Sequence, residues 1–455
     1  MNAEKSGNNV LAGNAKMVSR RDTEREVRSW IERNRTLIAD TVSDLIRIPS
    51  VNHGLTGDEQ NCQLHVAGML RELGLRVDVF TPDEVEGLAR HPAYYPGKNY
   101  ADRPNVVGIW SGAGNGRSLL FSSHADTAVA ATDWIRDPWR PEREGDRLYG
   151  LGSFDMKAGL AASALAVRCL KELGVRPLGD VIVESVVDEE FGGANGTLAA
   201  RARGYQADGA VIPEPTNMAV CTATRGGALW KAAFAGTGGM SFSGETVHNP
   251  VIDAAQFIVF LHWYEQTRNA ARPVHPSYAD SPELPVIVTR VMAGDLSAPI
   301  CDSGPVTCTV EFWAECHPGL TEQQFKEELA QRFSEWSSAQ NGPKTAFPEL
   351  TGMIRFLPGA ETPSDSPLTA VLAQAVGRAT GSEAIVRGAP FACDAFVFNL
   401  YSPTPAVVLG PRGANAHAPD EYVELSSLGE LVEAYALAIM DWCGYDKPER
   451  SCSEG

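Results

Sequence analysis

The feature that most constrains the fold of this chain is an alternation of short β-rich runs with helical segments. We expect helices at Glu24–Ile48, Asn61–Leu73 and Asp155–Leu173, and strands at Arg76–Phe80, Asn105–Trp110, Ser118–Ser122, Asp180–Val187 and Gly209–Pro213. Strands that alternate with helices predict an α/β fold with a mostly parallel sheet. In such a sheet, functional side chains collect beyond the carboxyl ends of the strands.

This alternation is interrupted near Arg225 and resumes after Pro358. The intervening segment predicts a smaller α+β unit, with a strand at Ala228–Phe234 and helices at Ile252–Tyr264 and Glu322–Trp336. A chain of 455 residues exceeds the usual size of one domain. We therefore expect residues 22–224 and 359–446 to form a main domain, with residues 225–358 inserted into it.

Composition excludes some classes of partner. The chain has 39 basic and 57 acidic residues, a net charge of −18. Without a basic patch to replace counterions, neither a nucleic acid nor a membrane is an expected partner. The nine cysteines form no CxxC pair, and no segment approaches a membrane span. Both features favour a cytoplasmic protein with reduced thiols.

Five short segments carry histidines and acidic residues, and several directly follow a β-rich run. They are His124-Ala125-Asp126, Asp155-Met156-Lys157, Asp188-Glu189-Glu190, Glu214-Pro215-Thr216 and His417-Ala418-Pro419. Burying such side chains without a counter-ion would be costly. Imidazole and carboxylate groups suit a pair of divalent ions roughly 3.5–4 Å apart, bridged by one carboxylate. The set therefore indicates a metallohydrolase.

The spacing of these residues suggests their roles. Asp126 lies two residues after His124, so both side chains reach one side of a strand, and Asp126 can hold the imidazole tautomer. Asp155, at the start of a helix, is the expected bridge.

Glu189 and Glu190 are adjacent, so we expect one to bind metal and the other to take a proton from metal-bound water. Glu214 would complete the shell of the first metal and His417 that of the second.

Five longer segments carry a family resemblance: SSHADT (Ser122–Thr127), GLGSFDMKAG (Gly150–Gly159), DEEFGG (Asp188–Gly193), PEPTN (Pro213–Asn217) and VLGPRGANAHAPDEYV (Val408–Val423). From about Glu24 to Cys443 the chain resembles the M20 family of metallopeptidases and amidohydrolases, which includes acetylornithine deacetylase, succinyl-diaminopimelate desuccinylase and glutamate-releasing carboxypeptidases. The resemblance implies a zinc-hydrolase-type catalytic domain with an inserted lid, usually a dimerisation domain, at about Arg225–Pro358.

The resemblance also implies a role for each motif residue. His124 and Glu214 would ligate one metal, Glu190 and His417 the other, and Asp155 both, whereas Glu189 would be the general base and Asp126 would orient His124. The expected cofactor is one or two divalent ions per subunit, of zinc, cobalt or manganese. The expected partners are a small-molecule substrate and a second copy of the chain, bound through the lid.

The lid departs from the family pattern. Met240 stands where relatives carry a histidine that stabilises the oxyanion, and Ser297 where an asparagine is common. The segment Cys316–Gly319 replaces one that supplies an arginine for the substrate carboxylate. His248 and His317 are candidate replacement donors, and Arg225, Arg290 and Arg412 are candidate carboxylate partners. His248, His317 and Arg290 are accordingly the predicted substrate-binding residues.

The leading functional hypothesis is hydrolysis of a C–N bond, in the amide of a small N-acyl amino acid or a dipeptide-like substrate. The alternative, motivated by the changes in the lid, is an aminohydrolase that attacks an activated aromatic or other non-peptide carbon and releases ammonia. A third hypothesis is a binding protein that keeps a hydrolase fold but has lost catalytic activity. The intact set of metal-site residues disfavours it.

Overall fold

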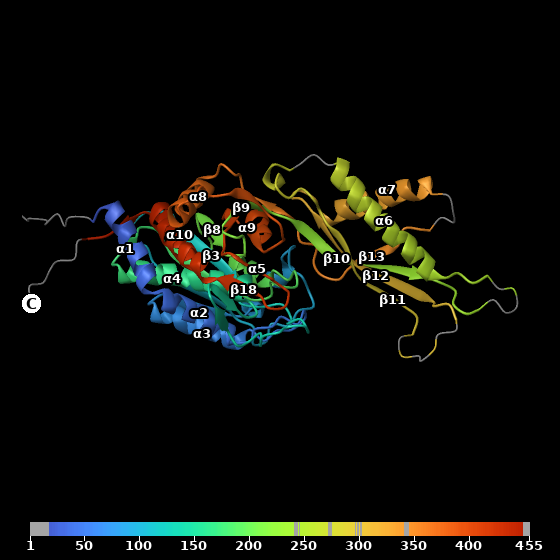
Figure 1. The fold of residues 1–455 in the computed structure, drawn as a ribbon, viewed down its shortest axis with the longest axis horizontal. Helices are drawn as coiled ribbons and strands as arrows, with labels where there is room; N and C mark the ends of the chain where they lie inside the picture. The colour runs from blue at the N-terminus through green and yellow to red at the C-terminus, as the bar shows by residue number, and fades with distance from the viewer. Residues whose placement is uncertain are drawn as a thin grey trace, which may run out of the picture.

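The computed structural model describes residues 18–448 apart from 241–243, 245, 272–274, 296, 298–299, 301–302 and 341–344. Figure 1 shows a larger α/β domain and an elongated smaller domain that extends from it. The smaller domain is the inserted lid, and its sheet begins at Gly226 and ends at Gly352. This span lies inside the predicted segment 225–358, whose ends stay predictions.

The larger domain is built on a mixed sheet of nine strands. Its order is β1 (Arg76–Phe80), β2 (Asn105–Trp110), β7 (Val181–Val186), β3 (Leu119–His124), β8 (Gly209–Ile212), β16 (Ala406–Val408), β9 (Val220–Thr224) and β14 (Ala360–Glu361), with β15 (Val386–Ala389) also paired to β9. The four central strands, β7, β3, β8 and β16, run parallel. The α/β class with a mostly parallel central sheet is thereby confirmed.

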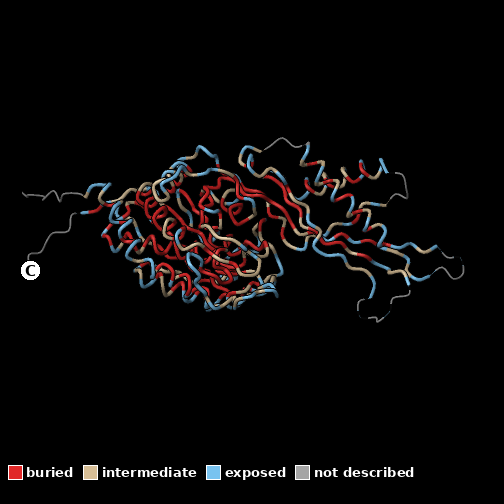
Figure 2. Tube along the Cα trace, in the orientation of Figure 1, coloured by how far each residue is buried: buried red, intermediate tan, exposed pale blue. Residues whose placement is uncertain are grey.

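Helices cover both faces of this sheet. One face packs against α1 (Arg20–Arg33), α2 (Arg35–Ile46), α3 (Gln60–Glu72), α4 (Ala158–Glu172), α8 (Pro367–Thr380) and α10 (Leu425–Cys443), and the other against α5 (Asn195–Ala202) and α9 (Ala395–Tyr401). Along β3 the side chains alternate, so that Phe121 joins the first core and Leu120 the second. Figure 2 shows the resulting concentration of buried residues in this domain.

Two predicted helices differ from the observed ones. The predicted helix Glu24–Ile48 is divided at Asn34, whose side chain donates to the Trp30 carbonyl and ends α1. The predicted helix at Asp155 begins three residues later, at Ala158, because Asp155 and Met156 have non-helical backbone angles. This irregular turn places the Asp155 carboxylate at the predicted metal site.

The lid consists of an antiparallel sheet covered by two helices. The sheet has the order β11 (Val286–Ala293), β12 (Thr307–Cys316), β10 (Gly226–Ala235) and β13 (Glu349–Gly352), and the helices are α6 (Pro250–Ala271) and α7 (Glu322–Ala339). Their contact is a separate aromatic core that includes Trp230, Phe257 and Phe312. The predicted separate α+β lid is confirmed.

A small four-stranded sheet fixes the C-terminal loop. It joins β4 (Glu142–Glu144), β5 (Arg147–Tyr149), β18 (Tyr422–Glu424) and β17 (Gly413–Ala414). The loop between β17 and β18 carries His417, and β5 leads directly to the turn that carries Asp155. The pairing of β5 with β18 therefore brings together two sites about 260 residues apart. The shortest pair of strands, β6 (Arg176–Pro177) and β19 (Tyr445–Asp446), lies elsewhere.

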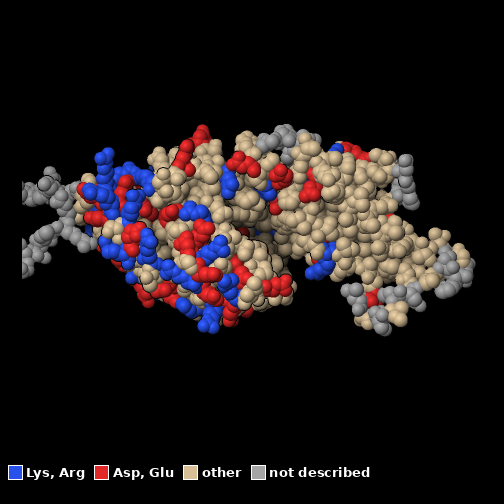
Figure 3. All heavy atoms as spheres, in the orientation of Figure 1, with Lys and Arg blue, Asp and Glu red and all other residues tan. Residues whose placement is uncertain are grey.

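The surface carries charges of both signs. On the face shown in Figure 3, Lys, Arg, Asp and Glu are interspersed over the larger domain, and the lid has few charges. In the described part of the chain, no helix is both long and apolar enough to cross a membrane.

Candidate metal centre

His124 ends the central strand β3 and points its ring into the site. Its Nδ1 donates to the backbone carbonyl of Asp126 at 2.8 Å, which leaves Nε2 without a proton in the neutral ring. Nε2 is buried and has no hydrogen-bond partner among the described residues. Carboxylate oxygens of Asp155, Glu214 and Glu189 nevertheless lie 3.3, 3.5 and 3.8 Å away. A buried nitrogen lone pair facing three carboxylates fits a cation site.

The Asp155 carboxylate lies between the two histidines. Its Oδ1 is 3.3 Å from His124 Nε2, and its Oδ2 is 3.3 Å from His417 Nε2. His417 Nε2 also lies 2.7 Å from Glu190 Oε2. Each oxygen of one carboxylate thus faces a different imidazole, which is the arrangement that a bridging ligand needs.

The structure brings all five predicted metal ligands and the predicted base together. Ligand atoms of His124, Glu189 and Glu214 lie within 4.8 Å of one another, and so do those of His124, Asp155 and Glu190. The two adjacent glutamates contact different histidines, Glu189 facing His124 and Glu190 facing His417. Which of these groups binds which ion stays a prediction.

Asp126 contacts the site differently from the sequence expectation. Its carboxylate Oδ1 is 3.7 Å from His124 Nδ1, and the backbone carbonyl makes the hydrogen bond instead. The other oxygen, Oδ2, accepts the backbone N–H groups of Glu189 and Glu190 at 2.9 and 3.0 Å and the Asn52 amide at 2.9 Å. Asp126 therefore holds the His124 imidazole through its backbone carbonyl. Through its carboxylate it also holds the acidic turn, residues Asp188–Glu190.

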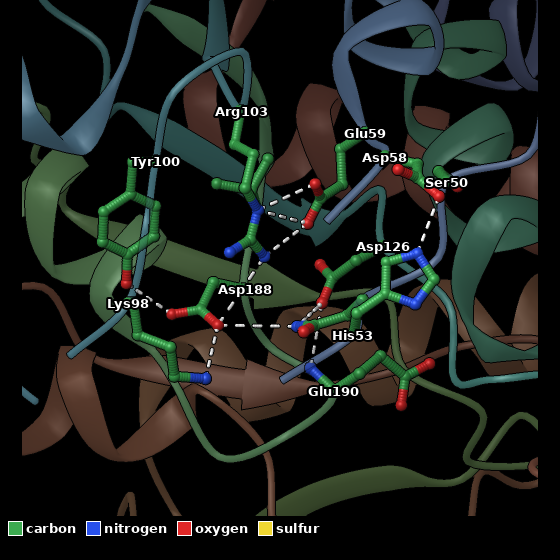
Figure 4. Close-up of polar contacts among 12 residues, drawn as sticks. Ser50, His53, Asp58, Glu59, Lys98, Tyr100, Arg103, Asp126, Asp188 and Glu190 are labelled. Carbon is green, nitrogen blue, oxygen red and sulfur yellow. Dashed lines mark hydrogen bonds and ion pairs between the residues drawn. The ribbon is translucent and has the colours of Figure 1, made fainter. Parts of the chain in front are cut away.

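Behind the acidic turn lies a buried network that centres on Asp188. Its carboxylate accepts from Lys98 Nζ at 2.8 Å and from the Tyr100 hydroxyl at 2.6 Å, as Figure 4 shows. Arg103 approaches the same carboxylate at 3.7 Å and makes a bidentate pair with Glu59. Buried charges are tolerated when they are paired in this way, and the pairing fixes the residue that precedes Glu189.

A second buried carboxylate, Glu421, supports Asp155. It accepts the backbone N–H groups of Gly152, Phe154 and Asp155 at 2.8, 2.7 and 2.9 Å. Burial is the main reason that its pKa rises to about 8, and the Asp155 charge adds to the effect. Glu421 therefore accepts hydrogen bonds from backbone N–H groups of the non-helical turn, which have no helical partner.

The pKa values of the two histidines rise in the metal-free site. Burial lowers the pKa of His124, but the charge of Glu214 and contacts with Asp155 reverse this and raise it well above its usual value. The charge of Glu190 raises the pKa of His417 to about 12, against the effect of burial. Burial would raise the pKa of Asp155, but contacts with both histidines hold it well below its usual range. Protons on the imidazoles thus balance the carboxylates where a divalent cation would.

The pKa values of Glu214, Glu189 and Glu190 rise, whereas that of Asp155 falls. Burial, with the charge of Asp155, raises the pKa of Glu214 to about 8. Burial also raises the pKa of Glu189 well above its usual value, opposed by His124 and supported by Glu214. The pKa of Glu190 rises for the same first reason, opposed by His417. A carboxyl group whose pKa is raised by burial beside a cation site is a candidate for proton transfer.

A cavity of about 510 Å³ opens in front of these groups. One wall includes Asp155, Glu189, Glu190, Glu214 and His417. The other comes partly from the lid, through Trp313, Glu315 and Ile354. Its size is that of a site for a small molecule.

The three predicted substrate-binding residues lie away from this cavity's lining. His248 is exposed in the lid and contacts Asp253 at 2.6 Å. His317 is buried with its ring 4.7 Å from that of Tyr278. Arg290 lies on β11, largely exposed, 3.6 Å from Glu311. Their role in substrate binding stays a prediction.

Several residues at or behind the site could not be identified from the sequence. Glu421 lies inside the quoted C-terminal motif, but its role depends on its contact with the non-helical turn at Asp155, which only the topology shows. Asn52, Lys98 and Trp313 belong to no motif, and nothing in the sequence singles them out.

Comparison with known proteins identifies the class. Residues 120–441 match the model of peptidase family M20/M25/M40, which is more than half of the chain. The chain belongs to this family and is a metallohydrolase that acts on C–N bonds.

Its relatives include deacylases. The chain is 26% identical over 393 residues to an acetylornithine deacetylase of Edwardsiella ictaluri, covering 83% of this chain and 91% of the relative. It is 26% identical to succinyl-diaminopimelate desuccinylase 2 of a Ruegeria species, covering 75% and 84%. A shorter match, 35% identical over 163 residues, joins 35% of the chain to 34% of an N-formyl-4-amino-5-aminomethyl-2-methylpyrimidine deformylase of Bacillus subtilis.

Solved structures share the fold. A dipeptidase of Saccharomyces cerevisiae superposes with a TM-score of 0.70 at 14% identity, covering 92% of this chain and 98% of that one. A tripeptidase of Staphylococcus aureus gives 0.67 at 19% identity, covering 90% and 99%.

Proposed function

We propose that this metallohydrolase cleaves the amide bond of a small N-acylated compound. The observation that carries the proposal is the Asp155 carboxylate between His124 and His417, with Glu189 beside it in a cavity of small-molecule size. The names of three relatives support it, since they are a deacetylase, a desuccinylase and a deformylase of an N-formyl compound.

The proposed ligands are His124 and Glu214 for one ion, Glu190 and His417 for the other, and Asp155 for both. Bound divalent ions, of zinc, cobalt or manganese, would polarise the amide carbonyl and make a water molecule more acidic. Occupancy by two ions is part of the proposal. A lid-mediated homodimer and a cytoplasmic location remain predictions.

Glu189 has the position and environment of the general base. Its carboxylate lines the cavity and is 3.8 Å from His124 Nε2, so it borders the proposed metal site. In the proposed reaction Glu189 takes a proton from the attacking water and gives it to the leaving nitrogen, which departs as an amine. Asp126 holds the Glu189 backbone at 2.9 Å, which keeps the carboxylate at the cavity wall.

The test is a comparison of wild type with Glu189→Gln. Protein loaded with each metal is assayed against N-formyl, N-acetyl and N-succinyl amides, and the amine and the acid released are measured separately. We expect Glu189→Gln to lose about 10²–10⁴-fold in kcat while retaining its metal, measured by mass spectrometry. Glu72→Gln, an exposed glutamate of α3, is the control. Full activity in Glu189→Gln with normal metal content would exclude the proposal.

The same assay addresses the alternative aminohydrolase. Attack on an activated aromatic carbon would release ammonia with no carboxylic acid product. Equal amounts of amine and acid support amide hydrolysis instead.

A further inference from the structure

We propose, on the basis of the function proposed above, that the amine part of the substrate is flat, apolar or aromatic, and carries no carboxylate. An amine of this kind differs from the amino acid or dipeptide-like amine that the sequence predicts. The inference rests on the lining of the cavity in front of the metal site and on the charged residues around it.

The walls of the cavity away from the proposed ligands are mainly apolar and aromatic. Phe154 lies beside Asp155, Trp313 comes from strand β12 of the lid, and Phe391 from the loop after β15. Ile354 and Leu357 complete this part of the lining. Side chains of this kind favour a flat apolar group, because ring stacking and burial of apolar surface both contribute.

No lysine or arginine is among the described residues that line the cavity. Arg225 is held by Glu315 at 2.6 Å and by the Ser281 carbonyl at 2.8 Å. Arg412 is bound to Glu424 and Glu430, and Arg290 is near Glu311. The arginines considered for a substrate carboxylate therefore all have acidic partners.

Glu315 adds a further negative charge to the lid side of the cavity. Its Oε1 accepts from the Trp313 indole at 3.2 Å, and its Oε2 accepts from Arg225, so the carboxylate is fixed in position. Five acidic residues line the cavity in total: Asp155, Glu189, Glu190, Glu214 and Glu315. Arg225 neutralises Glu315, and two divalent ions would supply four positive charges against the other four carboxylates. An extra carboxylate on the substrate would thus enter a site with no cation left to pair with it.

The test uses two compounds that differ by one carboxylate, N-formylbenzylamine and N-formylphenylglycine. We expect kcat/KM to be at least about tenfold higher for N-formylbenzylamine, because the carboxylate of the other compound is desolvated without a partner. Equal rates, or faster hydrolysis of N-formylphenylglycine, would overturn the inference and leave the proposed function intact.

If neither compound is hydrolysed, the affinities of the two compounds test the inference. The affinity of both compounds is measured by calorimetry for Glu189→Gln protein, with and without metal. Tighter binding of N-formylbenzylamine supports the inference even if the proposed reaction fails. Equal binding, or tighter binding of the carboxylated compound, overturns it.

Two variants test the residues named. Trp313→Ala is expected to lower kcat/KM for N-formylbenzylamine by about tenfold through the lost aromatic contact, whereas Trp263→Ala, a lid tryptophan outside the cavity, is the control. Ile354→Arg places a cation in the lining and should improve binding of N-formylphenylglycine by about tenfold. Ile287→Arg, at an exposed site on β11, should not. Failure of Ile354→Arg to change the preference would count against the inference.

Discussion

Lys98 Nζ lies 2.8 Å from Asp188 Oδ1, and the two side chains are 3% and 0% exposed. Because Asp188 precedes the Glu189-Glu190 pair, this buried ion pair fixes the start of the turn that carries the proposed base. Removing Lys98 leaves the buried Asp188 charge with the Tyr100 hydroxyl at 2.6 Å and Arg103 only at 3.7 Å. We expect Lys98→Met to lower the free energy of unfolding by about 3–5 kcal/mol, measured by urea denaturation. Lys231→Met, at an exposed position on β10, should change it by less than about 0.5 kcal/mol.

Loss of the Asp126 carboxylate should weaken metal binding without removing a proposed ligand. In Asp126→Ala, the backbone N–H groups of Glu189 and Glu190 lose their acceptor, so the acidic turn is no longer fixed. We expect about 10–100-fold weaker metal binding by calorimetry. Asp58→Ala removes an exposed carboxylate that contacts His53 and should leave the affinity unchanged. Unaltered affinity in Asp126→Ala would show that the turn is held by other contacts.

Metal binding should release protons and strengthen as the pH rises. The raised pKa of His124 and the value of about 12 for His417 mean that both imidazoles are protonated at neutral pH in the metal-free protein. A metal must displace these protons, so each proton displaced makes the apparent affinity rise about tenfold per pH unit. Calorimetry in buffers of different ionisation enthalpy counts the protons. A proton count of zero would contradict this prediction.

The stability of the metal-free protein should have the opposite pH dependence. Glu214 has a pKa of about 8 in the fold against 4.5 ordinarily, so the folded state holds a proton that the unfolded chain releases between these values. The stabilising contribution is complete below pH 4.5 and is lost as the pH rises to 8. His417, raised from 6.5 to about 12, acts in the same direction at higher pH, reduced because its side chain is half exposed. The melting temperature of metal-free protein should fall from pH 6 to 8.5, and bound metal should remove that fall.

Glu421→Ala should destabilise the turn at Asp155. The substitution leaves the backbone N–H groups of Gly152, Phe154 and Asp155 without their acceptor in a buried region. Each unpaired donor costs about 1–3 kcal/mol, so we expect a lower melting temperature and weaker metal binding together. Glu421→Gln keeps one acceptor oxygen and should have the smaller effect. Equal effects of the two variants would argue against the hydrogen bonds as the cause.

Much of the main domain could be predicted from the sequence. The predicted strands at Arg76–Phe80 and Asn105–Trp110 match β1 and β2 residue for residue. The polar segments after β3, β7 and β8 meet because these parallel strands end at one edge of the sheet. The convergence of the metal-site residues follows from that topology, whereas their pairing with individual ions does not.

Other parts of the structure could not be predicted from the local sequence pattern. Strand β9 (Val220–Thr224) has the sequence VCTAT, with small and polar residues that do not mark a buried strand, and β14 has only two residues. The Lys98–Asp188 and Asn52–Asp126 contacts join residues 90 and 74 positions apart. The position of Trp313 depends on how the lid is joined to the main domain, which no local pattern describes.

The lid joins the main domain through two chain segments that lie side by side. Gly227 and Leu357 exchange backbone hydrogen bonds of 2.9 Å at this junction, close to the end of β9 and the start of β14. Trp313 and Glu315 lie on one side of the junction, and His124 and Glu214 on the other. Trp313 also packs against the core of the main domain, and Arg355 of the lid donates to Asn195 of the main domain. A molecule that touches both sets of side chains would add to these contacts, so its affinity would depend on how the lid is held against the main domain.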